Sequence, residues 1–423
     1  MMQRRAFLAA GASLAAASAT PGFAAPVLSA DNFGLTLEQA RRRNGWIEID
    51  AAAFEANIDA VRAVIGSVRL CAVMKADAYG NGVALLMPSI LKKRIGELAI
   101  ASNDEARVAR RLGYRGRLVR VRAATAAEME DGAPFAVEEL IGNPDAAAHL
   151  QALAKKSGRR RWPVHLALNS GGMSRNGIEL SSDYGKADAR AVLGFDRLGI
   201  KGAMTHYPSE EEADILGQLH RYLEDLAWLR SRGLSTDGVL RHTANSFATL
   251  KHRETWLDMV RVGGLLYGDP GSVAVDTYRP TMAIKSRIAA INHYPVGQTV
   301  NYDRTYRLER ESWLANIPLG YSDGYRRGFS HANRPEFPAE GRNRTQVLIR
   351  GRRFPVVGRV TMNTMMVDVT EGRDLTRLGD EVVLFGAQGG ERITQAEFEA
   401  NSSAYGPEML AVLGATLPRV LGA

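Results

Sequence analysis

A lysine follows an apolar segment early in the chain, in a setting where its amine could bond covalently to a carbonyl compound. The segment Leu70–Met74 has the composition of a buried strand and runs directly into Lys75-Ala76-Asp77-Ala78-Tyr79-Gly80. An amine desolvated by apolar walls has a lowered pKa, and its neutral form can attack a carbonyl to give a Schiff base. Most lysines after strands are solvated, so this interpretation needs further polar groups nearby.

Such groups follow the later apolar segments. They are Asn169-Ser170-Gly171-Gly172-Met173-Ser174-Arg175-Asn176, then His206, then Asn245-Ser246, and finally Arg261, Gly263, Gly264 and Tyr267. If the apolar segments are parallel strands of a closed barrel, their carboxyl ends meet at one face, where the active sites of such barrels lie. We therefore expect a single site assembled from residues that are distant in the sequence.

The elements that position these residues alternate between apolar segments and Ala-, Leu- and Arg-rich helical segments, which predicts a parallel sheet with crossover helices. After a leading strand at Trp46–Ile49, we expect strands at Leu70–Met74, Glu97–Ala101, Leu118–Arg122, Phe135–Ile141, Val164–Leu168, Ile200–Thr205, Val239–Thr243 and Met259–Tyr267. Eight strands over about 200 residues predict a (β/α)8 barrel. The alternative, an open doubly wound sheet, lacks a Gly-x-Gly-x-x-Gly motif after its first strand.

After about residue 282 the pattern changes to short apolar segments separated by Gly, Pro, Asn and Asp. Strands are expected at Ala283–Ile291, Ser312–Ile317, Gln346–Ile349, Thr364–Val369 and Glu381–Phe385, with a helix at Thr394–Asn401. We predict a barrel over residues 46–282 and a mostly β carboxyl-terminal domain over residues 283–423. The leading strand near residues 46–49 could pack with this second domain.

Composition excludes several classes of protein. The 423 residues include 54 Lys and Arg against 46 Asp and Glu, and a single cysteine, Cys71. One cysteine allows no intrachain disulfide and no cysteine-based metal cluster, and we predict no metal site. The basic residues are scattered instead of being concentrated among aromatic residues, which argues against a nucleic-acid-binding module.

The amino terminus resembles an export signal. Arg4-Arg5 precede an Ala-rich apolar run over residues 6–19, and small residues follow at Gly22 and Ala24. We predict a signal peptide over residues 1–25, cleaved before Ala25. The run is shorter than the roughly 20 residues of a membrane span, so we expect a soluble periplasmic protein. The paired arginines resemble a twin-arginine signal, although ordinary secretory signals carry such pairs too.

Residues 46–423 together resemble the alanine racemase family, whose members are pyridoxal-phosphate enzymes with a barrel and a β domain. The motifs that carry the resemblance are Ala72-Val73-Met74-Lys75-Ala76-Asp77-Ala78-Tyr79-Gly80, Met204-Thr205-His206, His242-Thr243-Ala244-Asn245-Ser246, Arg261-Val262-Gly263, Tyr302-Asp303-Arg304-Thr305-Tyr306, Gly320-Tyr321-Ser322-Asp323-Gly324-Tyr325 and Gly358-Arg359-Val360-Thr361-Met362-Asn363.

The resemblance implies a racemase that interconverts L- and D-amino acids with two bases. Lys75 would hold pyridoxal phosphate as a Schiff base and act on one face of the substrate α-carbon. Tyr302 of the partner subunit would act on the other face, with Arg175 lowering the pKa of its phenol. Each site of a homodimer would therefore contain residues of both subunits.

The resemblance also assigns the remaining contacts. Arg261 would donate to the pyridine nitrogen and leave it neutral, which weakens the ring as an electron sink and favours racemisation over transamination. The other cofactor contacts implied are Tyr79, His206, Ser246, Gly263, Gly264 and Tyr405. The substrate contacts implied are Arg175, Tyr302, Tyr321 and Met362.

Several positions depart from the family pattern. Ala167 stands where many alanine racemases have a carbamylated lysine, so Arg175 must be oriented by Asn169, by Asn176 or by a bound anion such as chloride. Asn363 stands where the family usually has Asp. Together with Arg120-Val121-Arg122 and the export signal, these departures resemble the periplasmic broad-spectrum racemases, which act on Lys, Arg, Met, Ala and similar amino acids.

Three alternatives remain at this point. A narrow alanine or serine racemase would share the mechanism and differ only in pocket width. A related decarboxylase of basic amino acids would need an acidic residue at the pyridine nitrogen, where this chain has Arg261. A non-catalytic pyridoxal-phosphate carrier would be a lone barrel, without the roughly 140 residues that follow this one.

Overall fold

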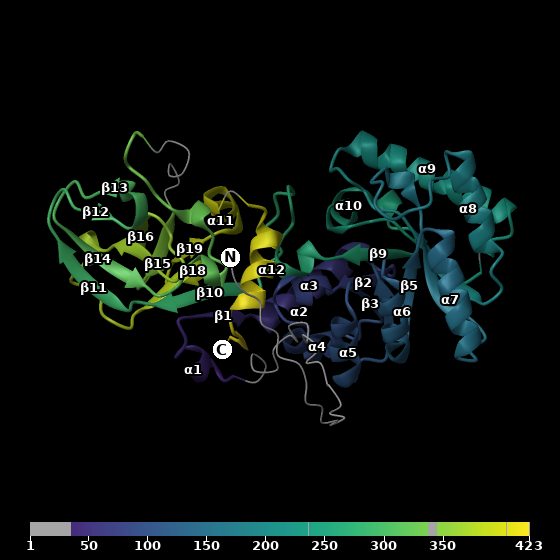
Figure 1. The fold of residues 1–423 in the computed structure, drawn as a ribbon, viewed down its shortest axis with the longest axis horizontal. Coiled ribbons are helices and arrows are strands. Elements are labelled where there is room, and N and C mark those ends of the chain that lie inside the picture. The colour runs from purple at the N-terminus through teal and green to yellow at the C-terminus, as the bar shows by residue number, and fades with distance from the viewer. Residues whose placement is uncertain (1–34, 236, 337–344, 403, 423) are drawn as a thin grey trace, which may run out of the picture.

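The computed structural model describes residues 35–235, 237–336, 345–402 and 404–422. Two domains lie side by side, a barrel with its helices and a mostly β domain (Figure 1). The predicted signal peptide lies outside the described residues. Within them, no helix combines the length and the apolar character needed to cross a bilayer.

Eight parallel strands form the barrel, which confirms the predicted fold class. They are β2 (Arg69–Val73), β3 (Glu97–Ile100), β4 (Arg117–Arg120), β5 (Val137–Ile141), β6 (Trp162–Ala167), β7 (Leu198–Met204), β8 (Leu240–His242) and β9 (Met259–Val262), hydrogen-bonded in the order β8-β7-β6-β5-β4-β3-β2-β9. Two backbone hydrogen bonds, from Asp258 to Arg241 (3.1 Å) and from Arg261 to Ala244 (3.0 Å), bring β8 and β9 together and nearly close the barrel.

Helices connect and cover the barrel strands. They are α2 (Ala51–Ile65), α4 (Val83–Lys92), α5 (Asn103–Arg111), α6 (Ala126–Gly132), α7 (Pro144–Lys156), α8 (Asp183–Leu193), α9 (Glu212–Ser231) and α10 (Ser246–Lys251), while the short α1 (Leu37–Ala40) precedes the barrel. Many begin after a side chain that accepts a hydrogen bond from the first turn, as Ser102 does at α5 and Asn245 at α10.

Two predicted barrel strands are shortened by a 3₁₀ turn in the structure. The last one ends at Val262, because the backbone leaves the extended conformation at Gly263 and Gly264–Tyr267 form a 3₁₀ turn. The strand expected from Phe135 begins at Val137, since Ala133–Phe135 form another 3₁₀ turn. Apolar composition alone did not reveal either turn.

The carboxyl-terminal domain is built on a second sheet, in the order β11-β14-β17-β16-β15-β18-β10-β1-β20 with β19 beside β18. Its strands are β1 (Gly45–Ile49), β10 (Met282–Arg287), β11 (Ala290–Tyr294), β14 (Ser312–Ile317), β15 (Gln346–Ile349), β16 (Arg352–Val357), β17 (Met365–Asp368), β18 (Glu381–Gln388), β19 (Glu391–Ile393) and β20 (Arg419–Leu421). A hairpin of β12 (Thr299–Val300) and β13 (Tyr306–Arg307) and the helices α11 (Gln395–Ser402) and α12 (Gly406–Thr416) complete it.

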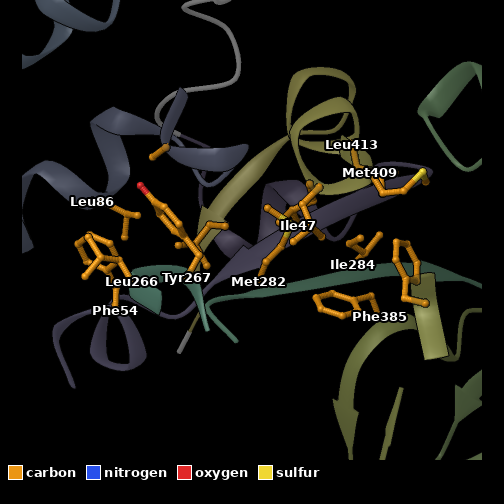
Figure 2. Packing of buried hydrophobic residues seen from close by; sticks show 14 of the residues in the cluster. Ile47, Phe54, Leu86, Leu266, Tyr267, Met282, Ile284, Phe385, Met409 and Leu413 are labelled. Atoms are coloured by element: carbon orange, nitrogen blue, oxygen red, sulfur yellow. The ribbon is translucent and has the colours of Figure 1, made fainter. Parts of the chain in front are cut away.

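The leading strand of the chain lies in this second sheet. β1 pairs antiparallel with β10 and parallel with β20. One continuous apolar core joins the two domains (Figure 2). The residues labelled there are Ile47, Phe54, Leu86, Leu266, Tyr267, Met282, Ile284, Phe385, Met409 and Leu413. This shared core fixes how the second domain sits against the barrel.

The segment that carries Lys75 is a left-handed turn, labelled α3 (Lys75–Tyr79) in Figure 1. Ala76, Asp77, Ala78 and Tyr79 have φ values of 54°, 51°, 58° and 54°. Each non-glycine residue in this conformation costs about 1–2 kcal/mol. A run of four persists only where the surrounding structure compensates for that cost.

The end of the chain supplies part of this compensation. Asp77 accepts hydrogen bonds from the backbone N–H of Val83 (2.7 Å) and from Arg419 Nη1 of β20 (2.5 Å). Helix α12 packs directly on the turn, because a Cβ on Gly80 would lie 2.2 Å from the carbonyl oxygen of Leu410, and one on Gly414 would lie 2.2 Å from that of Gly80. The carboxyl-terminal segment therefore holds the lysine-bearing turn of the barrel.

Gly80→Ala is expected to destabilise the protein strongly. The substitution places a methyl group against Leu410 and forces an alanine to adopt a φ of +80°. The matched control is Gly66→Ala, where φ is +61° but no atom lies within 4 Å of the added Cβ. We expect Gly66→Ala to lower the free energy of unfolding by about 1 kcal/mol, because of its φ alone. We expect Gly80→Ala to lower it by at least about 2 kcal/mol more, because the methyl group overlaps Leu410. Equal decreases in the stability of the two variants, measured by thermal unfolding, would show that the contact with α12 does not contribute to stability.

Candidate active site

A cavity of about 490 Å³ opens at the carboxyl ends of the barrel strands, a volume typical of sites for small ligands. Nine of the residues singled out in the sequence line it together: Lys75, Tyr79, Arg175, His206, Ser246, Arg261, Gly263, Gly264 and Tyr405. They come from the carboxyl ends of five barrel strands, from the segments that follow them and from the start of α12. The expected convergence on one face is therefore present.

Lys75 lies in the cavity directly after β2, and its pKa is lowered. Burial is the main cause, and the positive charges of Arg175 and Arg261 add to it, while Glu105 opposes them. A lowered pKa increases the fraction of neutral amine near neutral pH, which is the form that attacks a carbonyl or accepts a proton. The environment of Lys75 thus fits the chemistry expected from its position.

His206 is a neutral imidazole in this cavity. Burial and the charges of Arg261, Arg175 and Lys75 lower its pKa to about 3. Arg261 Nη2 lies 3.2 Å from His206 Nδ1, so Nδ1 accepts and the ring proton is on Nε2. The neutral ring therefore adds no further positive charge to the cavity.

Hydroxyl and backbone N–H groups cluster at another wall of the cavity. Ser246 Oγ lies 3.2 Å from the backbone nitrogen of Gly263 and 3.4 Å from that of Leu265. A Cβ on Gly263 would lie 2.4 Å from the hydroxyl oxygen of Tyr79, so only glycine allows this approach. Such a group of donors suits a phosphate.

Arg261 is buried, and the protein uses both of its terminal nitrogens. Nη1 donates to the carbonyl oxygen of His242 (2.5 Å), and Nη2 donates to those of Thr205 (2.9 Å) and Thr243 (3.2 Å). Its Nε–H has no acceptor among the described residues, although Arg261 lines the cavity. That donor would suit an acceptor atom of a bound ligand, such as a ring nitrogen.

These features together fit pyridoxal phosphate. Lys75 would form the covalent link, Ser246, Tyr79 and the backbone of Gly263 would hold the phosphate, and Arg261 would face the ring nitrogen. The cavity is large enough for the cofactor and a small amino acid. Within the described residues, no group of three or more His, Cys, Asp or Glu side chains is arranged to hold a metal ion.

Three predicted site residues do not line this cavity. Tyr302, Tyr321 and Met362 belong to the carboxyl-terminal domain, and 70%, 41% and 54% of their surfaces are exposed. Tyr302 lies in the β12–β13 hairpin, at the end of that domain far from the barrel (Figure 1). The structure therefore does not bring them to the Lys75 of the same chain.

Tyr321 and Met362 nevertheless share one surface of that domain. The backbone N–H of Tyr321 donates to Thr361 (3.0 Å), and that of Ser322 donates to Met362 (2.9 Å). Asn363, which replaces the usual family Asp, donates from Nδ2 to Ser322 Oγ (2.9 Å). Hydrogen bonds therefore hold the loop that carries Tyr321 against the loop that carries Met362.

Arg175 has no hydrogen bond to Asn169 or Asn176 in the structure. Asn169 instead donates to Glu179 (2.6 Å) and accepts from the backbone N–H of Ser174 (2.7 Å), which shapes the loop before Arg175. A small cavity of about 20 Å³ lies beside Ala167, and its walls include Asn169, Arg175 and Asn176. It is large enough for a single water or a small ion.

Several residues of the site were not singled out from the sequence. Asp77 and Arg419 hold the lysine turn, and Glu210 and Asp269 line the cavity. Asp77 lies inside the sequence motif around Lys75, so its place in the site could have been predicted from that motif. Nothing in the sequence indicates that Arg419, more than 300 residues later, contacts it.

Comparisons with known proteins agree with this geometry. The family model for the alanine racemase N-terminal domain matches residues 49–270, and that for the alanine racemase C-terminal domain matches residues 281–421. A broad specificity amino-acid racemase from Aeromonas hydrophila is 47% identical, with 89% of each chain covered. A lysine racemase from Proteus mirabilis is 44% identical, also with 89% of each chain covered.

Solved structures show the same fold. An alanine racemase from Bacillus anthracis with bound L-Ala-P is 28% identical, with a TM-score of 0.79 over 90% of this chain and 95% of that chain. One from Bartonella henselae, with covalently bound pyridoxal phosphate, is 22% identical, with a TM-score of 0.75 over 89% of this chain and 99% of that chain. The chain belongs to the alanine racemase family and is a racemase that acts on amino acids.

Proposed function

We propose that the protein is a pyridoxal-phosphate-dependent amino-acid racemase of broad specificity, with two bases drawn from two subunits. The observation that carries this proposal is the convergence of Lys75, the phosphate-binding donors and Arg261 on one cavity. The relatives named broad specificity amino-acid racemase and lysine racemase support the substrate range.

Pyridoxal phosphate, when bound, withdraws electrons from the substrate α-carbon and makes its proton labile. Lys75 supplies the covalent attachment and then a base on one face of that carbon, and its lowered pKa keeps the amine available in neutral form. Arg175 and Arg261 add positive charge to the same cavity, which favours a substrate carboxylate.

Arg261 supports racemisation over the competing reactions. A guanidinium remains protonated and donates a hydrogen bond without transferring its proton, so the ring nitrogen would stay neutral. The ring is then a weaker electron sink, and the α-carbon regains its proton sooner. The position of Arg261 also argues against a decarboxylase with an acidic residue at this place.

The second base is proposed to come from a second copy of the chain. The tyrosines of the cavity, Tyr79 and Tyr405, have raised pKa values, because each is partly or fully desolvated and lies near the carboxylate of Asp269. A raised pKa leaves less of each phenol ionised near neutral pH, so neither is suited to accept the substrate proton. Tyr302 of the partner subunit, exposed in each chain, would complete the cavity of a homodimer, together with the surface that carries Tyr321 and Met362.

An anion such as chloride is proposed to occupy the small cavity beside Ala167. The family lysine that would otherwise fill this space is absent, and Arg175 has no hydrogen bond to the neighbouring asparagine side chains. A negative ion there would lie against the guanidinium and the amide N–H groups and would orient Arg175.

Export to the periplasm is also proposed, from residues 1–25. Replacement of Arg4-Arg5 by Lys-Lys, followed by cell fractionation, tests the twin-arginine route. Loss of periplasmic activity would support that route, and unchanged activity would exclude it in favour of the general secretory route.

The purified enzyme, loaded with pyridoxal phosphate, is expected to racemise L-Lys, L-Arg and L-Met at rates comparable with L-Ala, and L-Ser as well. Separate incubations and chiral quantification of both enantiomers measure this. Activity confined to Ala or Ser would instead favour the narrow racemase. No racemisation of any substrate, with release of carbon dioxide, would favour the decarboxylase.

Tyr302→Phe is expected to retain bound cofactor but to lose exchange of the α-proton from one enantiomer, because only Lys75 then acts on the substrate. Exchange is followed by mass spectrometry in deuterated water, starting separately from each enantiomer. Tyr184→Phe is the matched control, since Tyr184 is also exposed, at 71%, but lies on the barrel helix α8. Equal exchange from both enantiomers in Tyr302→Phe would contradict the two-base assignment.

Removal of chloride is expected to lower kcat/KM by about tenfold, since one lost charge-assisted hydrogen bond is worth about 1.5–3 kcal/mol. Activity is compared in chloride and gluconate buffers of equal ionic strength. Bromide should restore activity and give an anomalous scattering peak beside Ala167 in crystals. Ala167→Lys should abolish the halide dependence, and identical activity in both buffers would refute the anion.

A further inference from the structure

Five charged or titratable side chains form an unbroken chain of hydrogen bonds inside the barrel, starting from the cavity. We call it the Arg261 chain. It runs from Arg261 of β9 through His242 of β8, His165 of β6 and Glu138 of β5 to Arg117 of β4. The first three of these side chains are buried, and Glu138 is nearly so.

Every link of the Arg261 chain has hydrogen-bond geometry. Arg261 Nη1 lies 3.2 Å from His242 Nδ1, and His242 Nε2 lies 2.8 Å from His165 Nδ1. His165 Nε2 lies 2.8 Å from Glu138 Oε2, and Arg117 binds both oxygens of that carboxylate at 2.8 Å through Nε and Nη2. The chain therefore crosses the barrel from the cavity to the amino-terminal end of β4.

A glycine makes the contact between the two histidines possible. They come from β6 and β8, and β7 lies between these strands in the sheet. At the crossing point β7 carries Gly202, where a Cβ would lie 2.3 Å from His165 Nδ1 and 2.9 Å from His242 Nε2. Any side chain at this position would push into the hydrogen bond.

Both histidines are neutral. Burial lowers the pKa of His165 despite the neighbouring Glu138, and it lowers the pKa of His242 well below its usual value, with His165, Arg261 and Arg117 adding to the effect. Burial alone would raise the pKa of Glu138, but hydrogen bonds from His165 and Arg117 lower it to about 2. The acceptor at the end of the chain is therefore an ionised carboxylate.

The carboxylate fixes the direction of every hydrogen bond. Glu138 can only accept, so the single ring proton of His165 is on Nε2, and Nδ1 must accept from His242. The ring proton of His242 is then also on Nε2, and its Nδ1 accepts from Arg261. If the hydrogen bonds ran in the opposite direction, the ring proton of His242 would be on Nδ1 and would point at an N–H of Arg261.

We propose that the Arg261 chain positions Arg261 for the cofactor. Glu138 sets the donor-to-acceptor direction of the hydrogen bonds, and His165 and His242 pass that direction on to Arg261. Nη1 of Arg261 donates both to the carbonyl oxygen of His242 and to His242 Nδ1, the first link of the chain, while backbone carbonyls accept from Nη2. Nε–H has no acceptor among the described residues and is left for a ligand. Only this last link, from Arg261 to the cofactor ring, rests on the proposed function. His165, His242 and Glu138 are positioning residues, because none of them lines the cavity.

The chain does not serve as a proton channel. Proton transfer along it would require Arg261 to give up and regain a proton in turn, and a guanidinium retains its proton in proteins. The chain instead fixes the orientation of its side chains, because each of them has only one arrangement in which every donor faces an acceptor. A chain with one open link would leave a buried donor or acceptor unsatisfied, which is costly.

The ring protons can be observed directly in the cofactor-loaded protein labelled with ¹⁵N-histidine. The nitrogen shifts of His165 and His242 are expected to show two neutral rings with the proton on Nε2. Their signals are assigned by loss in His165→Asn and His242→Asn. An Nδ1–H tautomer or a doubly protonated ring at either position would overturn the proposal, whatever reaction the enzyme catalyses.

Glu138→Gln tests the role of the carboxylate, because an amide can donate as well as accept. We expect weaker binding of pyridoxal phosphate to the apoprotein, by about tenfold, and a similar fall in kcat with KM changed less than about threefold. Glu138→Asp keeps an acceptor-only group and should recover part of the affinity. Unchanged cofactor affinity in Glu138→Gln would refute the positioning role.

Glu139→Gln is the matched control. Glu139 is the next residue of β5 and is buried in an ion pair with Arg120 (Nε to Oε2, 2.7 Å) outside the Arg261 chain. It should lower the thermal stability as Glu138→Gln does, while leaving the cofactor affinity unchanged. An equal loss of cofactor affinity in both variants would mean that any buried ion pair has this effect, and the proposal would fail.

Discussion

The site depends on the left-handed turn that holds Lys75 at the end of β2. Four consecutive non-glycine residues in this conformation are unfavourable by about 1–2 kcal/mol each, so the turn needs partners outside itself. Asp77 provides them through Val83 and Arg419, and the backbone of α12 packs against Gly80. The reactive amine of the barrel is thus held by residues of the other domain.

The charges of the cavity follow from the same arrangement. Lys75, Arg175 and Arg261 share one space, and burial together with their mutual repulsion lowers the pKa of Lys75. His206 remains neutral beside them. Under the proposed function, this positive charge suits an anionic cofactor and a substrate carboxylate, and the lowered pKa of Lys75 favours the neutral amine that a base requires.

The fold could be predicted from the sequence because the eight apolar segments alternate with helical ones at regular spacing. The residues of the cavity could be predicted because they lie within motifs that follow those strands, as Lys75 and Arg261 do. Arg419 could not be predicted, since its partner Asp77 is more than 300 residues away and no local pattern records the contact. Strand β20 and helix α12 were missed for a related reason, because β20 pairs with β1 and α12 packs on the lysine turn, both far away in the sequence. Strand β16 pairs with its sequence neighbours β15 and β17, and it was missed because its paired arginines and proline hide its apolar residues.

The shared core also limits how the proposed second base, Tyr302, could reach a substrate. β1 and β20 lie beside β10 in the second sheet, and the same apolar cluster continues into the barrel. A domain joined to the barrel in this way cannot swing to bring its Tyr302 to its own Lys75 without exposing that core to water, at about 25 cal/mol for each Å² of apolar surface. The proposed closure of the cavity by a second copy of the chain requires no such rearrangement, so the shared core favours the proposal of a site shared between subunits.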